Sequence, residues 1–269
     1  MLARLWYNLS AIQRNLRFGK MKSRLDKLLV ERGLAASRER AQSLILAGKV
    51  LVNEQRIEKS GAPVDADASV RLLGDDLKYV SRGGLKLERA LSHWRIDVSG
   101  RTCVDVGAST GGFTDCLLQH GAARVSAIDT GYGQIDFRLR QDPRVRLLEK
   151  TNARYLTHGM LGESASFIAM DVSFISATLV LPAVIHSAFP DDEEEPHGRQ
   201  LVVLVKPQFE AGRGEVGKGG IVRSESAQLA AVERVRRAVL DLSAKSTDVI
   251  ESPILGGEGN REFLLYAKL

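Results

Sequence analysis

The sequence predicts an α/β fold in which a doubly wound, mostly parallel sheet follows a small α+β domain. Three observations predict it. From about residue 83 onward, short apolar runs alternate with helical stretches, as in parallel α/β sheets. A glycine-rich turn follows the first of these runs. Before residue 74 the pattern is instead helix, helix and strand, with many basic residues.

Composition limits the possible classes of protein. The 269 residues are 44% hydrophobic and 26% charged, which is ordinary for a folded globular chain. The two cysteines, Cys103 and Cys116, lack a CxxC spacing and indicate a reduced, cytoplasmic setting. The five histidines form no metal-binding pattern, so we expect no metal. No apolar run approaches the ~18 residues of a membrane span, and Ala177–Ile185, which Pro182 interrupts, is predicted to be a core helix.

Charge is distributed unevenly along the chain. The net charge is +5, yet residues 1–60 hold 13 Lys/Arg against 5 Asp/Glu, so the rest of the chain sums to −3. A basic head either binds a polyanion or only solubilises the protein, and charge alone leaves both readings open. Residues 1–21, basic and without an acid up to Lys20, are interpreted as an extension of unassigned role.

Residues 22–73 are predicted to form the small α+β domain. A first helix has its apolar face at Leu25–Leu29 and ends at Gly33. Ser37 is placed to cap a second helix, which ends at Gly48 and is followed by an alternating strand over 49–53. Five basic residues flank the helix pair and are the candidate RNA contacts: Arg24, Lys27, Arg38, Arg40 and Lys49.

This segment resembles a known RNA-binding module. The run RLDKLLVERGLAASRERAQSLILAGKVLVNEQRI is similar to the alpha-L motif of a small-subunit ribosomal protein, several pseudouridine synthases and tRNA synthetases. The resemblance implies that the helix pair lies on structured RNA and that its basic residues meet phosphates. The alternative is a helical dimerisation module with a charged surface.

The second domain is predicted over residues 83–269, after a linker over 74–82. Its predicted strands cover 102–106, 124–128, 166–170, 200–205, 247–250 and 262–268. Helices are predicted over 112–120 and 224–242.

A glycine-rich turn, Asp105–Phe113, lies between the first strand and the next helix. Doubly wound sheets bind nucleotide-like ligands at this position. Its spacing is not the GxGxxG of dinucleotide enzymes. An acid before the first glycine suits a ligand with an ammonium group, and Asp129, at the end of the second strand, is placed to accept hydrogen bonds from ribose hydroxyls. The two acids favour S-adenosylmethionine over NAD.

A second glycine-rich run resembles a phosphate-binding loop incompletely. Gly212–Lys218 matches the P-loop pattern, but Gly219 stands where a hydroxyl would hold Mg²⁺. We therefore interpret this run as a mobile loop over the substrate or against phosphates.

Four further residues stand in contexts similar to those of the ribose 2′-O-methyltransferases related to FtsJ. These enzymes carry a Lys-Asp-Lys-Glu set, matched here by Lys86 in SRGGLKLERAL, Asp171 in AMDVSFIS, Lys206 in LVKPQFE and Glu262 in GNREFLLYA. The resemblance implies that Lys206 is the base, that Asp171 places its ammonium, and that Lys86 and Glu262 position ribose and phosphate. Taken singly, each could be a solvated or capping residue.

The runs DVGASTGGFTD, IDTGYGQ, EKTNAR, MDVSFIS and KPQFEAGRGEVGKGG extend the resemblance to the TlyA family, over roughly residues 22–269. That family is known both as haemolysin-like proteins and as ribosomal RNA cytidine-2′-O-methyltransferases. It implies a Rossmann-like methyltransferase domain, a cytoplasmic location, and ribosomal RNA or ribosomal subunits as partner. The predicted S-adenosylmethionine set is Asp105, Gly107, Ala108, Ser109, Gly111, Gly112, Phe113, Asp129, Asn152 and Asp171.

Two other functions stay open at this stage. One is an RNA-binding protein whose methyltransferase fold is inactive, and cofactor binding would discriminate it. The other is a membrane-active haemolysin, which liposome leakage would test. For Phe174 and Phe209, base stacking and core packing are equally compatible with the sequence.

Overall fold

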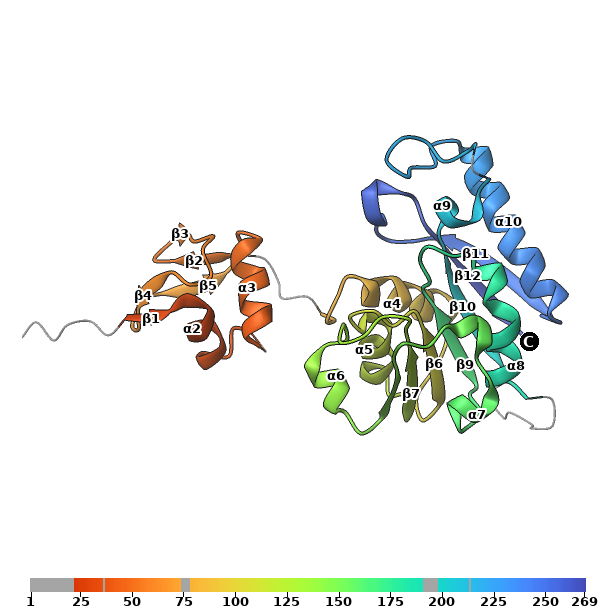
Figure 1. The fold of residues 1–269 in the computed structure, drawn as a ribbon, viewed down its shortest axis with the longest axis horizontal. Helices are drawn as coiled ribbons and strands as arrows, with labels where there is room; N and C mark the ends of the chain where they lie inside the picture. Colours follow the sequence, from red (N-terminus) through yellow and green to blue (C-terminus); the bar gives the residue numbers. More distant parts are fainter. Residues whose placement is uncertain (1–21, 36, 74–77, 191–197, 213) are drawn as a thin grey trace, which may run out of the picture. The chain divides into compact units, whose positions relative to one another are not determined.

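The computed structural model describes residues 22–35, 37–73, 78–190, 198–212 and 214–269, and these fall into two compact units (Figure 1). The small unit ends at residue 73 and the large unit begins at residue 78. The N-terminal extension that we predicted lies outside the described residues.

The small unit packs two helices on short antiparallel strands. Its elements are β1 (Lys22–Arg24), α2 (Leu25–Glu31), α3 (Arg38–Leu46), β2 (Val50–Val52), β3 (Gln55–Arg56), β4 (Pro63–Asp65) and β5 (Val70–Leu72). Strand β1 pairs with β4, and β2 lies between β3 and β5. Ser37 caps α3 as predicted, because its hydroxyl accepts a hydrogen bond from the Arg40 amide. Leu25, Leu29 and Ile45 are completely buried in the core of this unit.

The large unit is built on one sheet of seven strands in the order β11-β12-β10-β9-β6-β7-β8. The strands are β6 (Thr102–Val106), β7 (Arg124–Ile128), β8 (Val145–Leu148), β9 (Phe167–Met170), β10 (Gln200–Val205), β11 (Ser246–Glu251) and β12 (Phe263–Lys268). Strands β10, β9, β6, β7 and β8 run parallel, and β12 is antiparallel to both of its neighbours. The doubly wound, mostly parallel fold predicted from the sequence is therefore confirmed.

Helices cover both faces of this sheet (Figure 1). On one face α4 (Gly83–Trp94), α5 (Gly112–Gln119) and α6 (Phe137–Gln141) bury side chains against the strands. The other face carries α7 (His158–Leu161), α8 (Leu181–Ala188) and α10 (Glu225–Asp241). Short elements complete the unit: α9 (Pro207–Glu210), η1 (Ala153–Tyr155), η2 (Ala177–Leu179) and η3 (Gly257–Gly259).

Three details differ from the sequence predictions. Strand β8 was not predicted, because its exposed Arg146 and half-exposed neighbours weaken the apolar pattern. The helix predicted over Ala177–Ile185 begins only at Leu181, after the separate turn η2, and Pro182 lies in the first turn of α8, where proline is tolerated. The predicted linker extends too far, since Tyr79 is buried against Gly84 inside the large unit. In the parts of the chain that the structure describes, no helix is long and apolar enough to cross a membrane.

Candidate active site at the carboxyl edge of the sheet

The turn over 107–112 follows β6, and the atoms packed against it explain its glycines. Gly107 and Gly111 adopt φ of +87° and +97°, a region that disfavours side chains. A Cβ at Gly107 would also collide with the main-chain oxygen of Asp171, and one at Gly112 would collide with Ser81. The turn therefore lies directly against the end of β9 and against the start of α4.

Asp129 at the end of β7 binds the glycine turn. One of its carboxylate oxygens accepts a hydrogen bond from the Ser109 amide (2.8 Å) and the other accepts one from the Gly131 amide (2.6 Å). Each carboxylate oxygen can accept more than one bond, so capacity is left for a ligand hydroxyl. The predicted ribose acceptor thus lies at the predicted strand end and also fixes the turn.

A cavity of about 480 Å³ opens beside Asp129. That volume lies within the range of small-molecule sites. Apolar side chains line part of it, and polar groups at strand ends line the rest: Val106, Gly107, Ser109, Ile128, Asp129, Thr130, Gly131, Gln134, Thr151, Asn152, Ala153, Asp171, Val172, Ser173, Phe174, Ile175 and Val180. Five predicted cofactor residues are among them, namely Gly107, Ser109, Asp129, Asn152 and Asp171.

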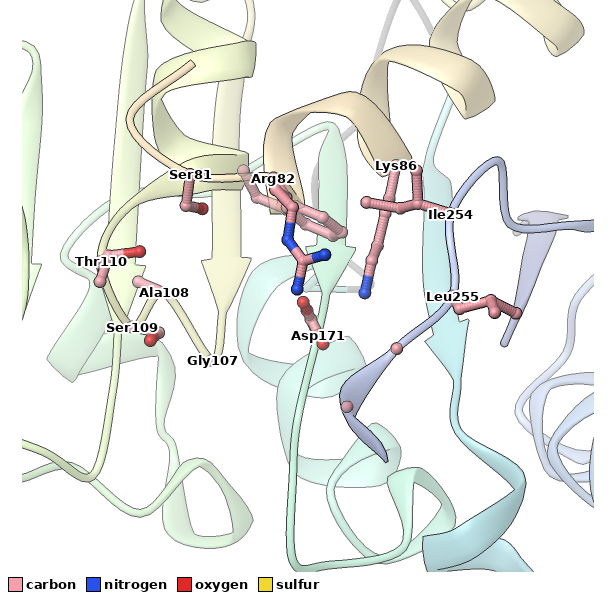
Figure 2. A pocket seen from close by; sticks show the side chains of 15 residues that line it. Ser81, Arg82, Lys86, Gly107, Ala108, Ser109, Thr110, Asp171, Ile254 and Leu255 are labelled. Atoms are coloured by element: carbon pink, nitrogen blue, oxygen red, sulfur yellow. The ribbon is translucent and has the colours of Figure 1, made fainter. Parts of the chain in front are cut away.

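A second cavity, of about 250 Å³, shares Gly107, Ser109 and Asp171 with the first (Figure 2). The predicted residues Ala108, Gly112 and Phe113 line it, together with Lys86. Gly111 lines neither cavity. The two cavities therefore adjoin at the glycine turn and Asp171, so a ligand in one lies next to a ligand in the other.

Lys206 forms an ion pair with Asp171. Its Nζ lies 2.6 Å from the Asp171 carboxylate and donates a hydrogen bond to the Ser173 hydroxyl at 2.7 Å. The Lys206 side chain is only 12% exposed. Because the two residues follow β10 and β9, which are parallel neighbours, the fold brings both to the same edge.

Lys86 and Glu262 form a second ion pair, more deeply buried. The Lys86 Nζ donates to Glu262 at 2.5 Å, and the two side chains are 11% and 2% exposed. Gly256 makes room for this pair, since a Cβ there would overlap the Glu262 carboxylate. Removing one partner of such a pair would leave the other charge buried and unpaired, which is strongly destabilising. The four residues predicted as catalytic are thus arranged as two ion pairs, and Lys86 and Asp171 both line the second cavity.

Asp105 is completely buried beneath the glycine turn and lines neither cavity. The Thr114 hydroxyl donates to one carboxylate oxygen at 2.6 Å, while the other oxygen has no hydrogen-bond partner among the described residues. Burial raises the pKa of Asp105 to about 7. The sequence predicted a direct contact between Asp105 and a ligand ammonium. Asp105 is not placed for that contact, because its carboxyl group reaches neither cavity.

Phe174 follows Asp171 in the loop after β9 and is 93% exposed, with φ of +64°. A bulky residue in this backbone region is unusual and is held there by its surroundings. Its ring contacts the half-buried Phe209 (centroids 5.4 Å apart) and lines the larger cavity. Core packing, one of the two roles left open by the sequence, does not describe Phe174.

Asn260 ties the second glycine-rich run to the site. It is buried, accepts a hydrogen bond from the Val222 amide (3.1 Å) and donates to the Gly220 carbonyl (2.9 Å). Glu262 is two residues from Asn260. Asn260 therefore links the segment that follows this run to the strand that carries Glu262. Arg213, within the run, lies outside the described residues.

Sequence reasoning missed several residues of the site. Arg82 lines the second cavity, and Figure 2 shows its side chain and that of Lys86 extending toward Asp171. The signal was the i, i+4 spacing of two cations at the start of α4. Ser81 and Gly256 were also missed, and for Gly256 the glycines before Glu262 were the only local signal.

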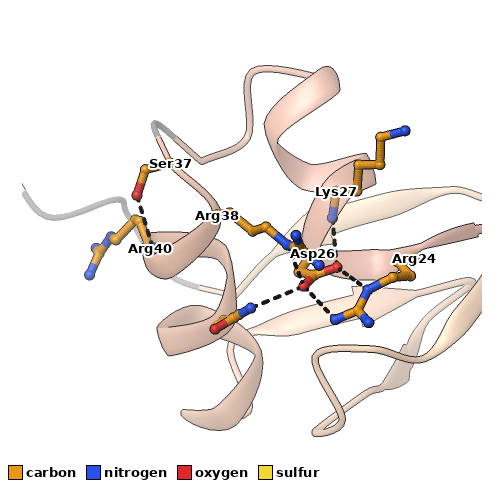
Figure 3. A network of polar contacts seen from close by, with 7 residues as sticks. Arg24, Asp26, Lys27, Ser37, Arg38 and Arg40 are labelled. Carbon is orange, nitrogen blue, oxygen red and sulfur yellow. Dashed lines mark hydrogen bonds and ion pairs between the residues drawn. The ribbon is translucent and has the colours of Figure 1, made fainter. Parts of the chain in front are cut away.

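In the small unit, Asp26 organises part of the predicted RNA-binding set (Figure 3). Asp26 is completely buried and accepts hydrogen bonds from Arg24 (2.9 and 3.0 Å), Arg38 (3.0 Å) and Gln42 (3.1 Å). The hydrogen bond from Arg24 is the largest of the effects that hold the pKa of Asp26 well below its ordinary value. Both arginine side chains stay about half exposed.

The side chains of the other predicted RNA contacts do not bind Asp26, which accepts only the Lys27 main-chain amide from this group (2.9 Å). Lys27 is exposed and pairs with Glu31 along α2 (3.5 Å), whereas Arg40 and Lys49 are partly buried. Arg24, Arg38 and Lys27 therefore each have a structural partner besides any ligand. Within the described ranges, no group of His, Cys, Asp and Glu could hold a metal ion.

Comparison with known proteins adds independent evidence. Residues 79–269 match the FtsJ-like methyltransferase family, and residues 23–70 match the S4 domain. A Bacillus subtilis protein, YqxC, named as a candidate rRNA methyltransferase, is 46% identical over 250 residues, covering 91% of this chain and 85% of that protein. The Mycobacterium tuberculosis 16S/23S rRNA (cytidine-2′-O)-methyltransferase TlyA is 44% identical, covering 92% and 90%.

Among solved structures, one described as a candidate hemolysin from Streptococcus thermophilus matches with a TM-score of 0.69 and 43% identity. The match covers 93% of this chain and 89% of the Streptococcus thermophilus chain. The similarity to these proteins therefore extends through both units.

Proposed function

The chain belongs to the FtsJ-like methyltransferase family and, within it, to the TlyA proteins, and from that premise we propose that it methylates the ribose 2′-hydroxyl of cytidine in ribosomal RNA with S-adenosylmethionine. The observation that carries the proposal is the convergence of the two ion pairs, Lys206–Asp171 and Lys86–Glu262, on adjoining cavities.

The larger cavity fits the nucleoside part of S-adenosylmethionine. Asp129 offers carboxylate oxygens to a ribose diol, while Ile128, Ala153 and Val180 offer apolar surface to a purine ring. Gly107 packs closely against the main chain of Asp171, and because it has no side chain the amino-acid part of the ligand could approach the main chain there. When bound, S-adenosylmethionine supplies an electrophilic methyl group on a sulfonium.

The residues of this chain would orient the attacking hydroxyl. A ribose hydroxyl is a weak nucleophile and requires alignment with the methyl group and removal of its proton. Asp171 lines both cavities, so the hydroxyl would meet the methyl group beside it. Lys206, held by Asp171 and Ser173, is within reach of the same point.

Lys206 is the residue we assign to the proton. In the resting protein its Nζ contacts the Asp171 carboxylate and donates a hydrogen bond to the Ser173 hydroxyl. Acting as base therefore requires the lysine to lose a proton before transfer and to regain one from the ribose hydroxyl. A lysine ammonium can give up a proton to become a base, whereas the guanidinium of arginine keeps its proton.

The smaller cavity supplies cations for the RNA backbone. Arg82 is exposed at its rim and has no anionic partner among the described residues, so it is free to meet a phosphate. Lys86 is fixed by Glu262 and would position the ribose. Phe174, exposed beside Asp171, is placed to stack on the base of the nucleotide to be methylated.

The small unit is proposed to anchor the RNA. Its match to the S4 domain and its exposed cations favour structured ribosomal RNA or a ribosomal subunit as partner, and hence a cytoplasmic location. A fragment beginning at Tyr79 should still bind S-adenosylmethionine but lose most of its affinity for ribosomal RNA. Equal RNA affinity for the fragment and the full chain would remove the small unit from this role.

The experiment that tests the proposed function is methyl transfer with the purified chain. It would be incubated with tritium-methyl-labelled S-adenosylmethionine and with either ribosomal subunits or the ribosomal RNA extracted from them. Since a 2′-O-methyl group blocks alkaline cleavage of the next phosphodiester, the label should survive in alkali-resistant dinucleotides whose first nucleoside is cytidine. Label on a base would overturn the 2′-hydroxyl assignment.

Cofactor binding separates this proposal from an inactive RNA-binding protein. Calorimetry should detect S-adenosylmethionine binding to the full chain. Absence of both binding and transfer, in a folded chain that binds RNA, would favour the inactive alternative.

A further inference from the structure

The exposed aromatic side chains of the described residues lie at one edge of the large unit. Large exposed aromatic rings occur at Tyr132, Phe137, Tyr155 and Phe174, with exposures of 68% or more. All four follow the ends of the parallel strands β7, β8 and β9. They therefore belong to the same edge of the sheet as the cavities.

Tyr132 is held rigidly although its ring is 69% exposed. The amide before it, Gly131, binds Asp129, and the amide after it, Gly133, donates to Glu149 at 2.6 Å. The Lys150 amide donates to the Gly131 carbonyl at 3.0 Å. A ring presented by a fixed loop loses little conformational freedom when something packs on it, so it is suited to binding.

Cations accompany these rings. The Lys150 Nζ lies 4.5 Å from the centre of the Tyr132 ring, and the Arg154 guanidinium lies 5.8 Å from that of Tyr155. Neither cation forms an ion pair with a described residue. Three other cations of the segment are already paired with acids, namely Arg138, Arg140 and Arg144.

Charge favours a polyanion at this edge. Residues 129–155 hold six Lys/Arg against four Asp/Glu, although the chain after residue 60 is net negative. Of the four acids, Asp136, Asp142 and Glu149 pair with arginines, and Asp129 accepts the amides of Ser109 in the glycine turn and of Gly131 in its own loop. Three cations of this segment form no ion pair with a described residue: Lys150 and Arg154 lie next to the rings, and Arg146 lies against Gly162.

Phe137 extends the same pattern into α6. The buried Ile135 and Leu139 flank it in the chain, whereas Phe137 is 68% exposed. The α6 N-terminus is attached to the glycine turn, because the Asp136 amide donates to the Thr110 carbonyl at 3.1 Å. The ring thus projects from an element joined to the cofactor turn.

We propose that Tyr132, Phe137 and Tyr155, with Lys150 and Arg154, form a second RNA-binding surface that holds single-stranded nucleotides next to the one to be methylated. The inference rests on the proposed function for the position of the target nucleotide. Single-stranded RNA fits because successive bases stack on aromatic rings while cations follow the backbone. This surface would bind RNA in addition to the small unit, which is proposed to bind structured RNA.

Photo-crosslinking of the full chain locates the contact. The probe is a 15-nucleotide oligocytidylate carrying single 4-thiouridines, and crosslinked peptides are identified by mass spectrometry. Crosslinks to the segment 129–155 are expected. Crosslinks confined to residues 22–73 would overturn the proposal. Because no methyl transfer is involved, this result is independent of whether the proposed reaction occurs.

Fluorescence anisotropy with the same oligocytidylate separates stacking from charge. The double variant Tyr132→Ala/Tyr155→Ala should bind about tenfold or more weakly at every salt concentration, with the salt slope unchanged. Tyr132→Phe/Tyr155→Phe should bind like the unaltered chain. Lys150→Gln/Arg154→Gln should instead flatten the slope of log K against log salt by about 1.4, or ~0.7 for each phosphate contact.

A matched control uses exposed apolar side chains elsewhere. Leu229 and Leu240 on α10 are 56% and 40% exposed, and Leu229→Ala/Leu240→Ala should leave binding unchanged. Equal binding by the control and by the double tyrosine variant would overturn the stacking surface. If the tyrosine variants weakened binding only to intact ribosomal subunits and not to the oligocytidylate, the surface would contact protein and the proposal would be wrong.

Discussion

Asp26 in the small unit and Asp105 in the large unit are both completely buried, yet their surroundings are opposite. Asp26 accepts hydrogen bonds from Arg24, Arg38 and Gln42, and its pKa is lowered. Asp105 has a hydroxyl partner and no cation, and burial raises its pKa to about 7. The small unit uses its buried carboxylate to hold surface arginines in place, whereas the large unit keeps a buried carboxyl group without a cationic partner beneath the glycine turn.

The same contrast extends to the other charged groups. In the large unit, Lys86, Glu262, Asp171 and Lys206 have low exposure and form pairs beside the cavities. Such pairs contribute little net stability, because desolvation of the charges offsets their attraction. They are therefore better explained by ligand chemistry than by folding. Substitutions in the two units should consequently fail in different assays.

The largest effect on stability is expected in the small unit. Asp26→Ala removes the acceptor of both arginines and Gln42, so the free energy of unfolding of this unit should fall by about 2–4 kcal/mol. Hydrogen exchange of peptides from 22–73, compared with peptides from 78–269, measures each unit separately. The control Lys27→Ala, which loses only the exposed pair with Glu31, should change little. Equal effects of the two substitutions would remove Asp26 from its organising role.

A slightly smaller effect is expected on ligand binding in the large unit. Asp129→Ala should weaken S-adenosylmethionine binding by about 1.5–3 kcal/mol, the cost of losing a charged hydrogen-bond partner. Calorimetry measures this affinity, with Asp142→Ala as a control, since Asp142 pairs with Arg144 and lines neither cavity. Unchanged affinity in a folded Asp129→Ala protein would contradict the assignment.

The third effect is a dependence of stability on pH. The folded Asp105 keeps its proton up to about pH 7, whereas an unfolded aspartate loses it near its ordinary value of 3.8. Between these values the folded state binds more protons, so the free energy of unfolding falls as pH rises, by at most about 1.4 kcal/mol per pH unit. Asp105→Asn should flatten this dependence in urea titrations between pH 4 and 7. An identical slope for the variant would show that Asp105 does not titrate there.

Asp26 should produce the opposite dependence. Because its pKa is lowered in the folded unit, its contribution is fully present above the ordinary value and is lost as pH falls through the lowered one. Acid should therefore destabilise the small unit while the Asp105 contribution still favours the large one. Hydrogen exchange at pH 3 and pH 6, corrected for intrinsic exchange rates, would detect opposite trends in the two units.

Local features of the large unit could be predicted from the sequence, whereas contacts between distant residues could not. The strand over Thr102–Val106, the turn after it and Asp129 were predictable, because short-range patterns of apolar residues and glycines determine them. The tetrad was found through resemblance. Its pairing was not predictable, since 176 positions separate Lys86 from Glu262 and no local pattern specifies that contact.

Burial and partners of charged residues were harder still. Arg24 and Arg38 were predicted as RNA contacts from their charge, and nothing in the sequence showed that both bind Asp26. Asp105 was predicted to meet a ligand because it precedes a glycine, whereas the fold turns its carboxylate toward Thr114. The strands of the small unit were largely missed because they are two or three residues long, too short for an alternating pattern.

The proposed reaction depends most on Lys206, because this residue should act in the chemical step. Single-turnover methyl transfer, with saturating ribosomal RNA and S-adenosylmethionine, isolates that step from binding. We predict that Lys206→Ala lowers the rate by about 10²-fold or more with nearly unchanged affinities, and that Lys206→Arg rescues it poorly because arginine keeps its proton. A near-normal rate for Lys206→Arg would show that Lys206 serves only as a positive charge and would contradict its role as base.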